Sequence, residues 1–341
     1  MPTDPIPRPT IYDVAQLAGV SKSLVSLVLR DAPHVSDVRR EAVLAAIEEL
    51  GYRPSPAASA LASQRTRTVG VLIDDFHNPW FVELLAGLRS ILDPAGYTAS
   101  VADLQLEAAS GRNPVDGFLA QHVDALVIAA DPAEGTLDGV SAPIVVAGTR
   151  EFGAAADAAL VADVVAGDDA LGARLATEHL IGLGHRSIGH LTGSSGPGAQ
   201  RRRGYEEAMQ AAGLDPLVFG ERGGTSEADG YAAACALLDA HPGITGVVAA
   251  NDVMAVGALA ALRERGLTVP ADVSVVGHDD SPLAAYRYLA LTSVDGHSRE
   301  VGAAAARTLL DRIDDPDAPP HRELLAPDLV VRSSTAPPPH P

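Results

Sequence analysis

The chain has 341 residues, 47% of them hydrophobic and 20% charged. This composition favours two or three compact units and argues against an intrinsically disordered chain. The sequence contains no run of 18 apolar residues, so it predicts no membrane span, and its first ten residues lack the features of a signal peptide. Cys235 is the only cysteine, which excludes an intrachain disulfide and a multi-cysteine metal site. We therefore expect a cytoplasmic protein.

The formal net charge of −19 is unevenly distributed along the chain. Residues 1–65 carry seven basic and seven acidic side chains, whereas the remaining 276 residues carry 18 basic and 37 acidic ones. An acidic core repels phosphate, so any contact with DNA must come from the N-terminal region. That region is itself neutral, and its charge gives no support for DNA binding.

Residues 1–54 predict three short helices. Thr10 and Asp13 form a capping-box pattern at the start of the first helix, and Gly19 suits the tight turn after it. Ser21 is expected to cap a second helix, Lys22–Leu29, with Val25, Val28 and Leu29 facing inward. Ser36 is expected to cap a third, Asp37–Leu50, which has Val38 among its apolar positions and ends at Gly51. This arrangement is typical of a helix-turn-helix bundle.

Residues 55–67 are small and polar and predict a linker, and from Thr68 onward strand-like runs alternate with amphipathic helices. Two sets of these units indicate two Rossmann-like lobes with a cleft at the carboxyl ends of their strands. The predicted strands are 68–73, 98–102, 125–129, 144–147, 187–191, 246–250 and 273–277. The predicted helices include 81–92, 169–183, 203–212, 228–240 and 253–265. The proline-rich end of the chain, residues 333–341, is expected to be disordered.

Several sequence blocks resemble the LacI/GalR (lactose-repressor) family. They are TIYDVAQLAGVSKSLVSLVL and HVSDVRREAVLAAIEELGYRP near the N-terminus, then NPWF, EHLIGLGHRSIGHLTG, RRRGYEEAM, NDVMAVGALAAL and ADVSVVGHDD. The resemblance implies an α/β chain with an all-α helix-turn-helix headpiece (1–54), a hinge (55–66) and a two-lobed, periplasmic-binding-protein-like core of parallel sheets (67–332). It places the first lobe at about 67–166 and 296–325, and the second at about 167–295 and 326–332.

The resemblance implies that the second helix enters the major groove of DNA. Lys22, Ser23 and Leu27 match base-contacting positions. Other matching DNA-contact positions are Thr10, Tyr12, Ser21, Ser26 and His34. Leu24 and Leu27 depart from the residues usual in the family, so an alternative interpretation is that both pack inside the bundle. An exposed Leu27 suits a thymine methyl group and cannot bridge a guanine.

In the hinge, Ala58 and Leu61 match family positions that contact DNA, and Leu61 matches a leucine that wedges into the minor groove. A segment this short does not form a stable helix alone, so we expect it to order on DNA within a dimer. Ser59 replaces a common arginine. The alternative is an inert alanine-rich linker.

The resemblance also implies an effector site between the two lobes. The matching positions are Asp74, Trp80, Phe81, Arg201, Asn251 and Asp279. Carboxylate, amide and guanidinium groups beside an aromatic face suit a carbohydrate. Alternatives are an inter-lobe ion pair for Arg201 and Asp279, and core packing for Trp80.

The sequence thus predicts a homodimeric transcriptional repressor that binds near-palindromic operator DNA under control of a small molecule, with no cofactor and no bound metal. Two competing hypotheses are a transporter's solute-binding protein and a sugar-processing enzyme. The first requires a signal peptide and no headpiece. The second requires a catalytic acid–base pair, and no motif supplies one.

Overall fold

The computed structural model describes residues 9–29, 34–52, 65–108, 110–149 and 162–339. The chain divides into two compact units, Met1–Thr66 and Arg67–Pro341, which we describe separately. The predicted hinge residues Ala58, Ser59 and Leu61 lie outside the described residues, so their roles stay predictions.

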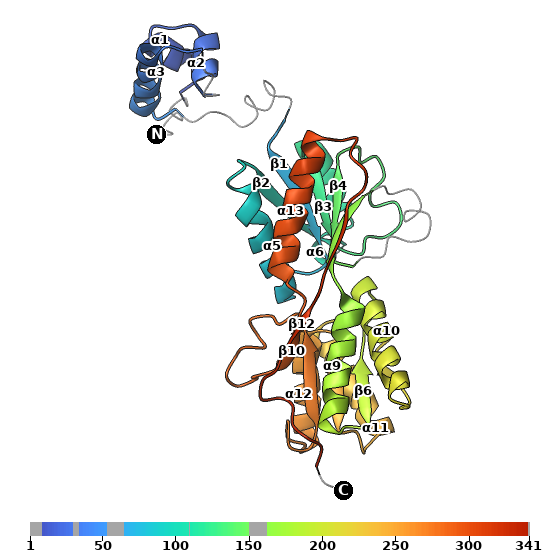
Figure 1. The fold of residues 1–341 in the computed structure, drawn as a ribbon. Coiled ribbons are helices and arrows are strands. Elements are labelled where there is room, and N and C mark those ends of the chain that lie inside the picture. Colours follow the sequence, from blue (N-terminus) through green and yellow to red (C-terminus); the bar gives the residue numbers. More distant parts are fainter. Residues whose placement is uncertain (1–8, 30–33, 53–64, 109, 150–161, 340–341) are drawn as a thin grey trace, which may run out of the picture. The chain divides into compact units, whose positions relative to one another are not determined.

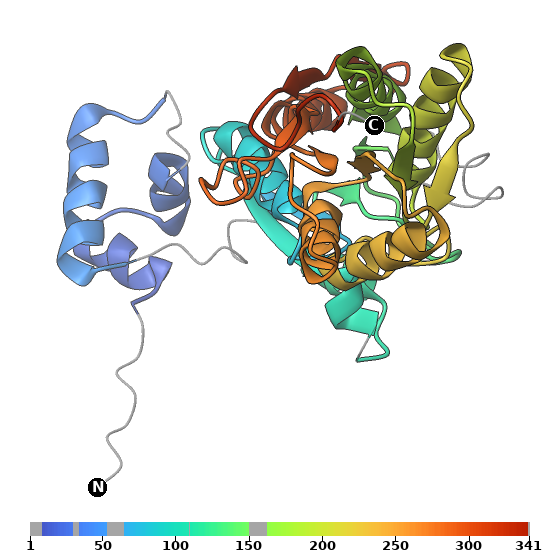
Figure 2. The ribbon, with the colours of Figure 1, turned by 90° about the horizontal axis from the view of Figure 1, so that it is seen from below.

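The first unit is a bundle of three helices, α1 (Ile11–Leu17), α2 (Lys22–Leu29) and α3 (Asp37–Leu50), which pack around one another (Figures 1 and 2). The predicted capping box is present, because Thr10 and Asp13 exchange side-chain and backbone hydrogen bonds at the start of α1. Gly19 adopts a φ of +65° in the turn between α1 and α2, a value that glycine tolerates without strain. Val14, Val25, Val28, Val43 and Ala46 form the buried centre of the bundle.

Two local predictions for this bundle, those for Ser36 and Leu29, are wrong. Ser36 precedes α3 but makes no side-chain capping bond. Leu29 is exposed because it lies about 100° around the helix from the buried Val28. Val38 is 78% exposed, because α3 turns Val43 and Ala46 inward, three positions apart.

The second unit contains two six-stranded sheets (Figure 1). Every paired strand in the first sheet is parallel; in the second sheet only the β10–β12 pair is antiparallel. The first sheet comprises β1 (Thr68–Ile73), β2 (Thr98–Asp103), β3 (Ala125–Ala129), β4 (Ile144–Ala147), β5 (Asp163–Gly167) and β11 (Arg322–Leu325). The second comprises β6 (Ile188–Leu191), β7 (Leu217–Phe219), β8 (Gly246–Ala249), β9 (Ser274–His278), β10 (Thr292–Asp295) and β12 (Asp328–Val330).

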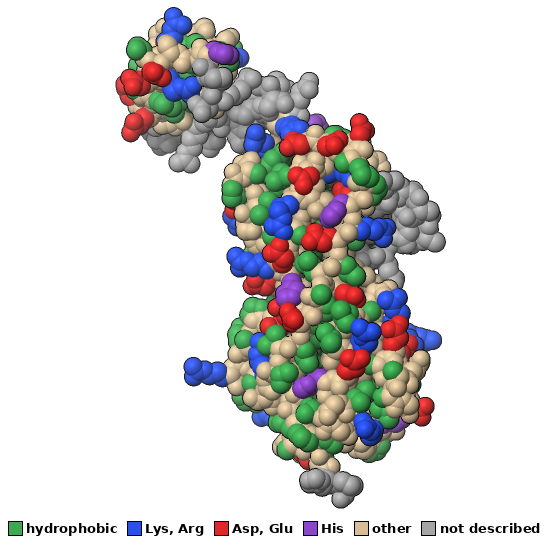
Figure 3. Space-filling model, viewed as in Figure 1, with side chains coloured by type: hydrophobic (Ala, Val, Ile, Leu, Met, Phe, Trp, Pro, Cys, Tyr) green, Lys and Arg blue, Asp and Glu red, His purple; other side chains and the backbone are tan. Residues whose placement is uncertain are grey.

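Helices cover both faces of each sheet. In the first lobe, α5 (Pro79–Leu92) and α13 (Ser298–Asp314) pack on one face and α7 (Pro114–Gln121) on the other; α6 (Leu104–Ala108) follows β2. In the second lobe, α11 (Glu227–Ala240) and α12 (Asp252–Glu264) pack on one face, opposite α9 (Asp169–Leu183) and α10 (Gly196–Ala211). Each lobe therefore has a three-layer architecture around two apolar clusters. On the face of the core drawn in Figure 3, acidic and basic side chains are interspersed.

The two lobes share one topology. The strand order is β2-β1-β3-β4-β5 in the first sheet and β7-β6-β8-β9-β10 in the second, and β11 and β12 extend the β5 and β10 edges. The next two strands along the chain pair on opposite sides of β1 (β2 and β3) and of β6 (β7 and β8). Each such reversal of strand order opens a crevice at the carboxyl ends of the strands. The chain crosses between the sheets after β5, after β10 and between β11 and β12.

Five strands (β5, β7, β10, β11 and β12) and the helices α6, α7 and α13 were not among the predicted elements. These strands span three to five residues, and most carry polar or half-buried positions, so they lack the apolar run that identifies β1 and β3. Helix α10 begins seven residues earlier than predicted. Ser195 caps it, and Pro197 occupies the first turn, where its missing N–H costs no hydrogen bond.

The predicted disorder from residue 333 is wrong for Ser334–Ala336. Val275 N donates to Ser334 O at 2.9 Å, and Ser334 Oγ donates to Val275 O at 2.6 Å. Ala336 N donates to Ser274 Oγ. This segment is therefore fixed along β9 by hydrogen bonds that its proline-rich composition conceals.

The packing of α10 on α9 requires a glycine. A Cβ at Gly204 would lie 1.9 Å from Ala170 O, a backbone atom that cannot yield. Gly204→Ala is expected to lower the free energy of unfolding by about 1–3 kcal/mol, as measured by urea titration. Gly182→Ala on α9 is the control, because nothing lies within 4 Å of its Cβ; it should be neutral or stabilise by about 0.5–1 kcal/mol. Equal losses for the two variants would contradict this packing.

Candidate functional site

The exposed face of α2 carries the side chains predicted to contact DNA. Lys22, Ser23 and Leu27 are exposed, and 43% of Leu27 is accessible to solvent. Leu24, in contrast, packs against the core of the bundle. The packing alternative therefore holds for Leu24, whereas Leu27 is placed where an apolar base contact is possible.

Tyr12 lies beside Lys22. The Lys22 ammonium donates to Tyr12 Oη at 3.3 Å and lies 4.9 Å from the centre of the ring. Thr10, Ser21 and His34 are exposed and Ser26 is half-buried. Ser21 Oγ also accepts from Leu24 N at 3.2 Å, as expected for a cap of α2.

A cleft of about 680 Å³ lies between the two lobes of the core. This volume falls within the range of about 300–1,000 Å³ that small-molecule sites occupy. Side chains that follow β1, β3 and β4 line it from the first lobe, and side chains that follow β6, β8 and β9 line it from the second. All six residues predicted for an effector site are among its lining residues: Asp74, Trp80, Phe81, Arg201, Asn251 and Asp279.

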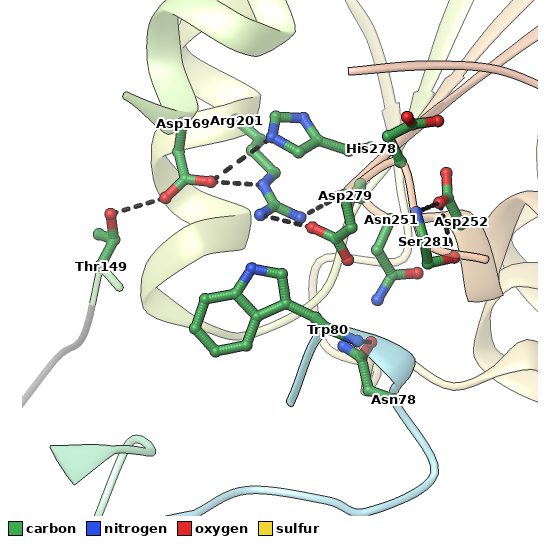
Figure 4. Close-up of polar contacts among 12 residues, drawn as sticks. Asn78, Trp80, Thr149, Asp169, Arg201, Asn251, Asp252, His278, Asp279 and Ser281 are labelled. Carbon is green, nitrogen blue, oxygen red and sulfur yellow. Dashed lines mark hydrogen bonds and ion pairs between the residues drawn. The ribbon is translucent and has the colours of Figure 1, made fainter. Parts of the chain in front are cut away.

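Arg201 on α10 is the centre of a buried ion cluster (Figure 4). Its Nε donates to Asp169 Oδ1 at 2.7 Å, its Nη2 lies 3.0 Å from Asp279 Oδ1, and its Nη1 donates to Ala250 O. Burial alone disfavours the charged guanidinium, but Asp169 and Asp279 outweigh this effect, so the pKa of Arg201 lies above its ordinary value. All three charged residues belong to the second lobe. The predicted alternative of an inter-lobe ion pair is therefore wrong, although the pair itself exists.

Two hydrogen bonds join the lobes at the cleft. Thr149 Oγ1, after β4, donates to Asp169 Oδ2 at 2.6 Å, so the Arg201 cluster reaches the first lobe (Figure 4). Gly196 N, at the start of α10, donates to Asp131 Oδ2 at 3.1 Å. Sequence patterns singled out neither Thr149 nor Asp131, because both follow strands without a distinctive motif.

Trp80 and Phe81 differ in their surroundings. Phe81 is 3% exposed and belongs to the apolar cluster of the first lobe, so most of its surface packs inside the protein. Trp80 packs edge-on against Phe81, with ring centres 5.0 Å apart, and projects from the first lobe toward the Arg201 cluster (Figure 4). Trp80 is therefore the aromatic wall of the cleft, and Phe81 supports it.

Asn251 is committed to local structure. Its Oδ1 accepts from Met254 N at 2.7 Å as the cap of α12, and its Nδ2 donates to Thr225 O at 3.1 Å. Asp74, at the end of β1, accepts from Asp131 N at 2.9 Å and so positions the residue that bridges to α10. These two predicted residues shape the cleft through neighbouring backbone groups.

Two further buried groups lie beside the cluster. Burial and the nearby charge of Asp279 raise the pKa of Asp252 to about 7, against the hydrogen bonds donated by Ser293 and Ser281. Burial and the charge of Arg201 hold the pKa of His278 well below its ordinary value, so its imidazole is neutral at pH 7. The sequence around residues 278–280 did not predict that Arg201 would lie beside His278 or that Asp252 would lie beside Asp279, because these pairs are distant in the chain.

Among the described residues, no group of three or more histidine, cysteine or acidic side chains is arranged to hold a metal ion. Within the same part of the chain, no helix combines the length and apolar character that crossing a membrane requires.

Comparison with known proteins extends these observations. The family model of the lacI family of bacterial regulatory proteins matches residues 10–55, and that of the periplasmic binding protein-like domain matches residues 177–335. The HTH-type transcriptional regulator CelR of Thermobifida fusca is 36% identical over 345 residues, which cover 96% of this chain and 98% of that relative.

Two solved structures resemble the whole molecule. A CelR–cellobiose complex has a TM-score of 0.69 and 34% identity, and the match covers 96% of this chain and 100% of that one. A lac repressor dimer bound to operator and the anti-inducer ONPF has a TM-score of 0.80 and 30% identity, covering 97% and 100%.

A helix-turn-helix bundle followed by a two-lobed, periplasmic-binding-protein-like core defines a class of DNA-binding transcriptional regulators. The chain belongs to the lacI family of bacterial regulatory proteins. The family and the fold class predicted from the sequence blocks are therefore confirmed.

The Arg201 cluster yields a stability prediction. Arg201→Met leaves Asp169 and Asp279 buried without their shared counter-charge, so the free energy of unfolding should fall by about 3–5 kcal/mol. Arg203→Met is the control on the same helix, because the Arg203 guanidinium is mostly exposed and lies 3.6 Å from Glu207; its loss should stay below about 1 kcal/mol. Urea unfolding measures both, and comparable losses would show that the buried cluster has no special weight.

Proposed function

We propose that this protein is an allosteric repressor: a homodimer whose headpieces bind a near-palindromic operator and whose cleft binds a sugar that alters operator affinity. The observation that carries the proposal is the presence, in one chain, of a helix-turn-helix bundle with an exposed α2 and a two-lobed core with a ligand-sized cleft. The two modules give the two binding sites that allosteric coupling requires.

On the DNA side, Lys22, Ser23 and Leu27 contact base edges, while serine and tyrosine hydroxyls position the headpiece on phosphates. The exposure of the α2 face supports this assignment. Thr10, Tyr12, Ser21, Ser26 and His34 are the further contacts. Ala58 and Leu61 are assigned to the minor groove on the sequence resemblance alone.

On the effector side, Trp80 covers one face of a sugar ring, while Asp74, Arg201, Asn251 and Asp279 define the polar part of the cleft. The relative CelR, whose solved complex contains cellobiose, supports a carbohydrate as the ligand class. Two hydrogen bonds between the lobes, at Thr149 and Asp131, change when the cleft opens or closes. Closure of the cleft on a ligand thereby changes how the two lobes are positioned relative to each other.

A sugar-processing enzyme is the less well supported alternative. Asp169 and Asp279 are both held in ion pairs with Arg201, so neither is placed to deliver a proton as a general acid. The relatives CelR and the lac repressor are regulators. We therefore propose a non-enzymatic, cytoplasmic protein.

The first experiment selects operator sequences from random duplexes at one fixed salt concentration. The wild-type protein should enrich a palindromic site, and Leu27→Ala should lose about 1 kcal/mol of preference for an A·T pair at one position of each half-site. Leu44→Ala is the control, because Leu44 is an exposed leucine of similar accessibility on α3. Leu61→Ala should weaken binding to all selected sites.

Recovery of a site with equal base preferences in the Leu27 and Leu44 variants would remove Leu27 from the interface. Enrichment of no site above non-specific binding, with or without added sugars, would overturn the DNA-binding half of the proposal.

The second experiment exploits the single tryptophan of the chain, Trp80. Its emission reports directly on the cleft, so a sugar that binds there, with cellobiose and glucose as first probes, should change the fluorescence and raise the Tm. Trp80→Ala, followed through the Tm because this variant has no tryptophan, should weaken binding at least about tenfold, since it removes the aromatic face. Phe76→Ala, a nearby exposed aromatic outside the cleft lining, should not. A sugar that raises the Tm without changing Trp80 emission binds somewhere else.

A further inference from the structure

The charged groups of the cleft are strongly unbalanced. Seven carboxylates line it, whereas Arg201 is the only arginine or lysine among the described lining residues. Two histidines complete the set. His278 is neutral at pH 7 because burial holds its pKa down, and His77 Nδ1 lies 2.6 Å from Asp75 Oδ1.

The single guanidinium is already used within the protein. Three of its nitrogens meet Asp169, Asp279 and the carbonyl of Ala250, and the residue is 8% exposed. Two carboxylates against one cation leave this cluster with a net negative charge. An anionic ligand that approached Arg201 would have to displace a buried aspartate from an ion pair of about 3 Å.

Helix N-termini are the other usual source of anion binding. Four helices of the second lobe, α9, α10, α11 and α12, begin at the cleft. In each helix one N–H group of the first turn donates to a side chain of the protein: Asp168 accepts from Leu171 N on α9, Ser195 from Gly198 N on α10, Ser226 from Asp229 N on α11, and Asn251 from Met254 N on α12.

Acidic side chains also occupy the positive ends of these helices. At α10, the Asp131 carboxylate reaches across from the first lobe to Gly196 N at 3.1 Å. Asp169, Glu227 and Asp252 occupy the first turns of the other three. The helix dipoles are thus matched by carboxylates of the chain, and no phosphate or carboxylate of a ligand is needed there.

The remaining chemistry favours hydroxyl groups. Carboxylate oxygens accept hydrogen bonds from sugar hydroxyls, and Trp80 supplies an apolar face. From the charge balance of the cleft we infer that its effector carries no negative charge. Among sugars the cleft takes the unphosphorylated, uncarboxylated form and rejects the acidic derivative. This inference rests on the cleft being the effector site proposed above.

The test uses the full-length protein and matched ligand pairs. Glucose, ribose and cellobiose are titrated alongside glucose 6-phosphate, ribose 5-phosphate and cellobiose 6′-phosphate, with Trp80 emission and calorimetry as readouts. We expect at least one neutral sugar to bind and its phosphate ester to bind at least about tenfold more weakly at low salt. Raising the salt concentration should narrow that gap, because screening weakens repulsion by charges and leaves a steric clash unchanged.

A charge variant separates repulsion from shape. Glu227→Gln removes one carboxylate from the cleft lining with little change in size, so the gap between ester and parent sugar should narrow. An ester that binds as well as its parent overturns the inference and leaves the sugar-sensing function intact. A gap that neither salt nor Glu227→Gln changes assigns the rejection to shape, which also overturns it. Binding of none of the six compounds counts against the proposed function itself.

Discussion

Arg201 is almost completely withdrawn from water, and its charge is stable there only because Asp169 and Asp279 lie on either side of it. Each partner comes from a different element, α9 and the end of β9, so the cluster fixes the position of α10 relative to the sheet. Through Asp169 it also reaches Thr149 of the first lobe. The polar side of the cleft, the packing of α9 on α10 and one contact between the lobes thus depend on the same buried charge.

The parts of the fold that the sequence predicts are those with strong local signals. β1 and β3 are uninterrupted apolar runs with matching boundaries, and α2, α3 and α9 have matching ends. The short strands β11 and β12 have no such signal. Their backbone pairing with β5 and β10 defines them as strands, and their side chains form no apolar run. Helix α13 is alanine-rich and packs closely on α5, where a Cβ at Gly302 would lie 2.1 Å from Leu84 O.

The residues that line the cleft were predicted one at a time from family positions, but the hydrogen bonds and ion pairs that connect them were not predicted. Asp169 and Arg201 are 32 residues apart, and Asp131 meets Gly196 across 65 residues. No periodicity in a sequence reports such pairs, since they arise when two lobes and two helices pack. Asn251 illustrates the converse: its position was predicted, but its side chain serves the backbone of α12 and of residue 225.

The three chain crossings between the lobes lie side by side. Asp168 N donates to Leu325 O at 2.9 Å, and a side chain on Gly167 would press against Gly296 O. A joint made of three adjacent connecting segments restricts how the lobes can move: a swing about the line of the joint bends the connections, whereas sliding one lobe past the other would stretch at least one of them. The opening angle between the lobes is therefore the coordinate along which an occupant of the cleft can most easily change the shape of the core.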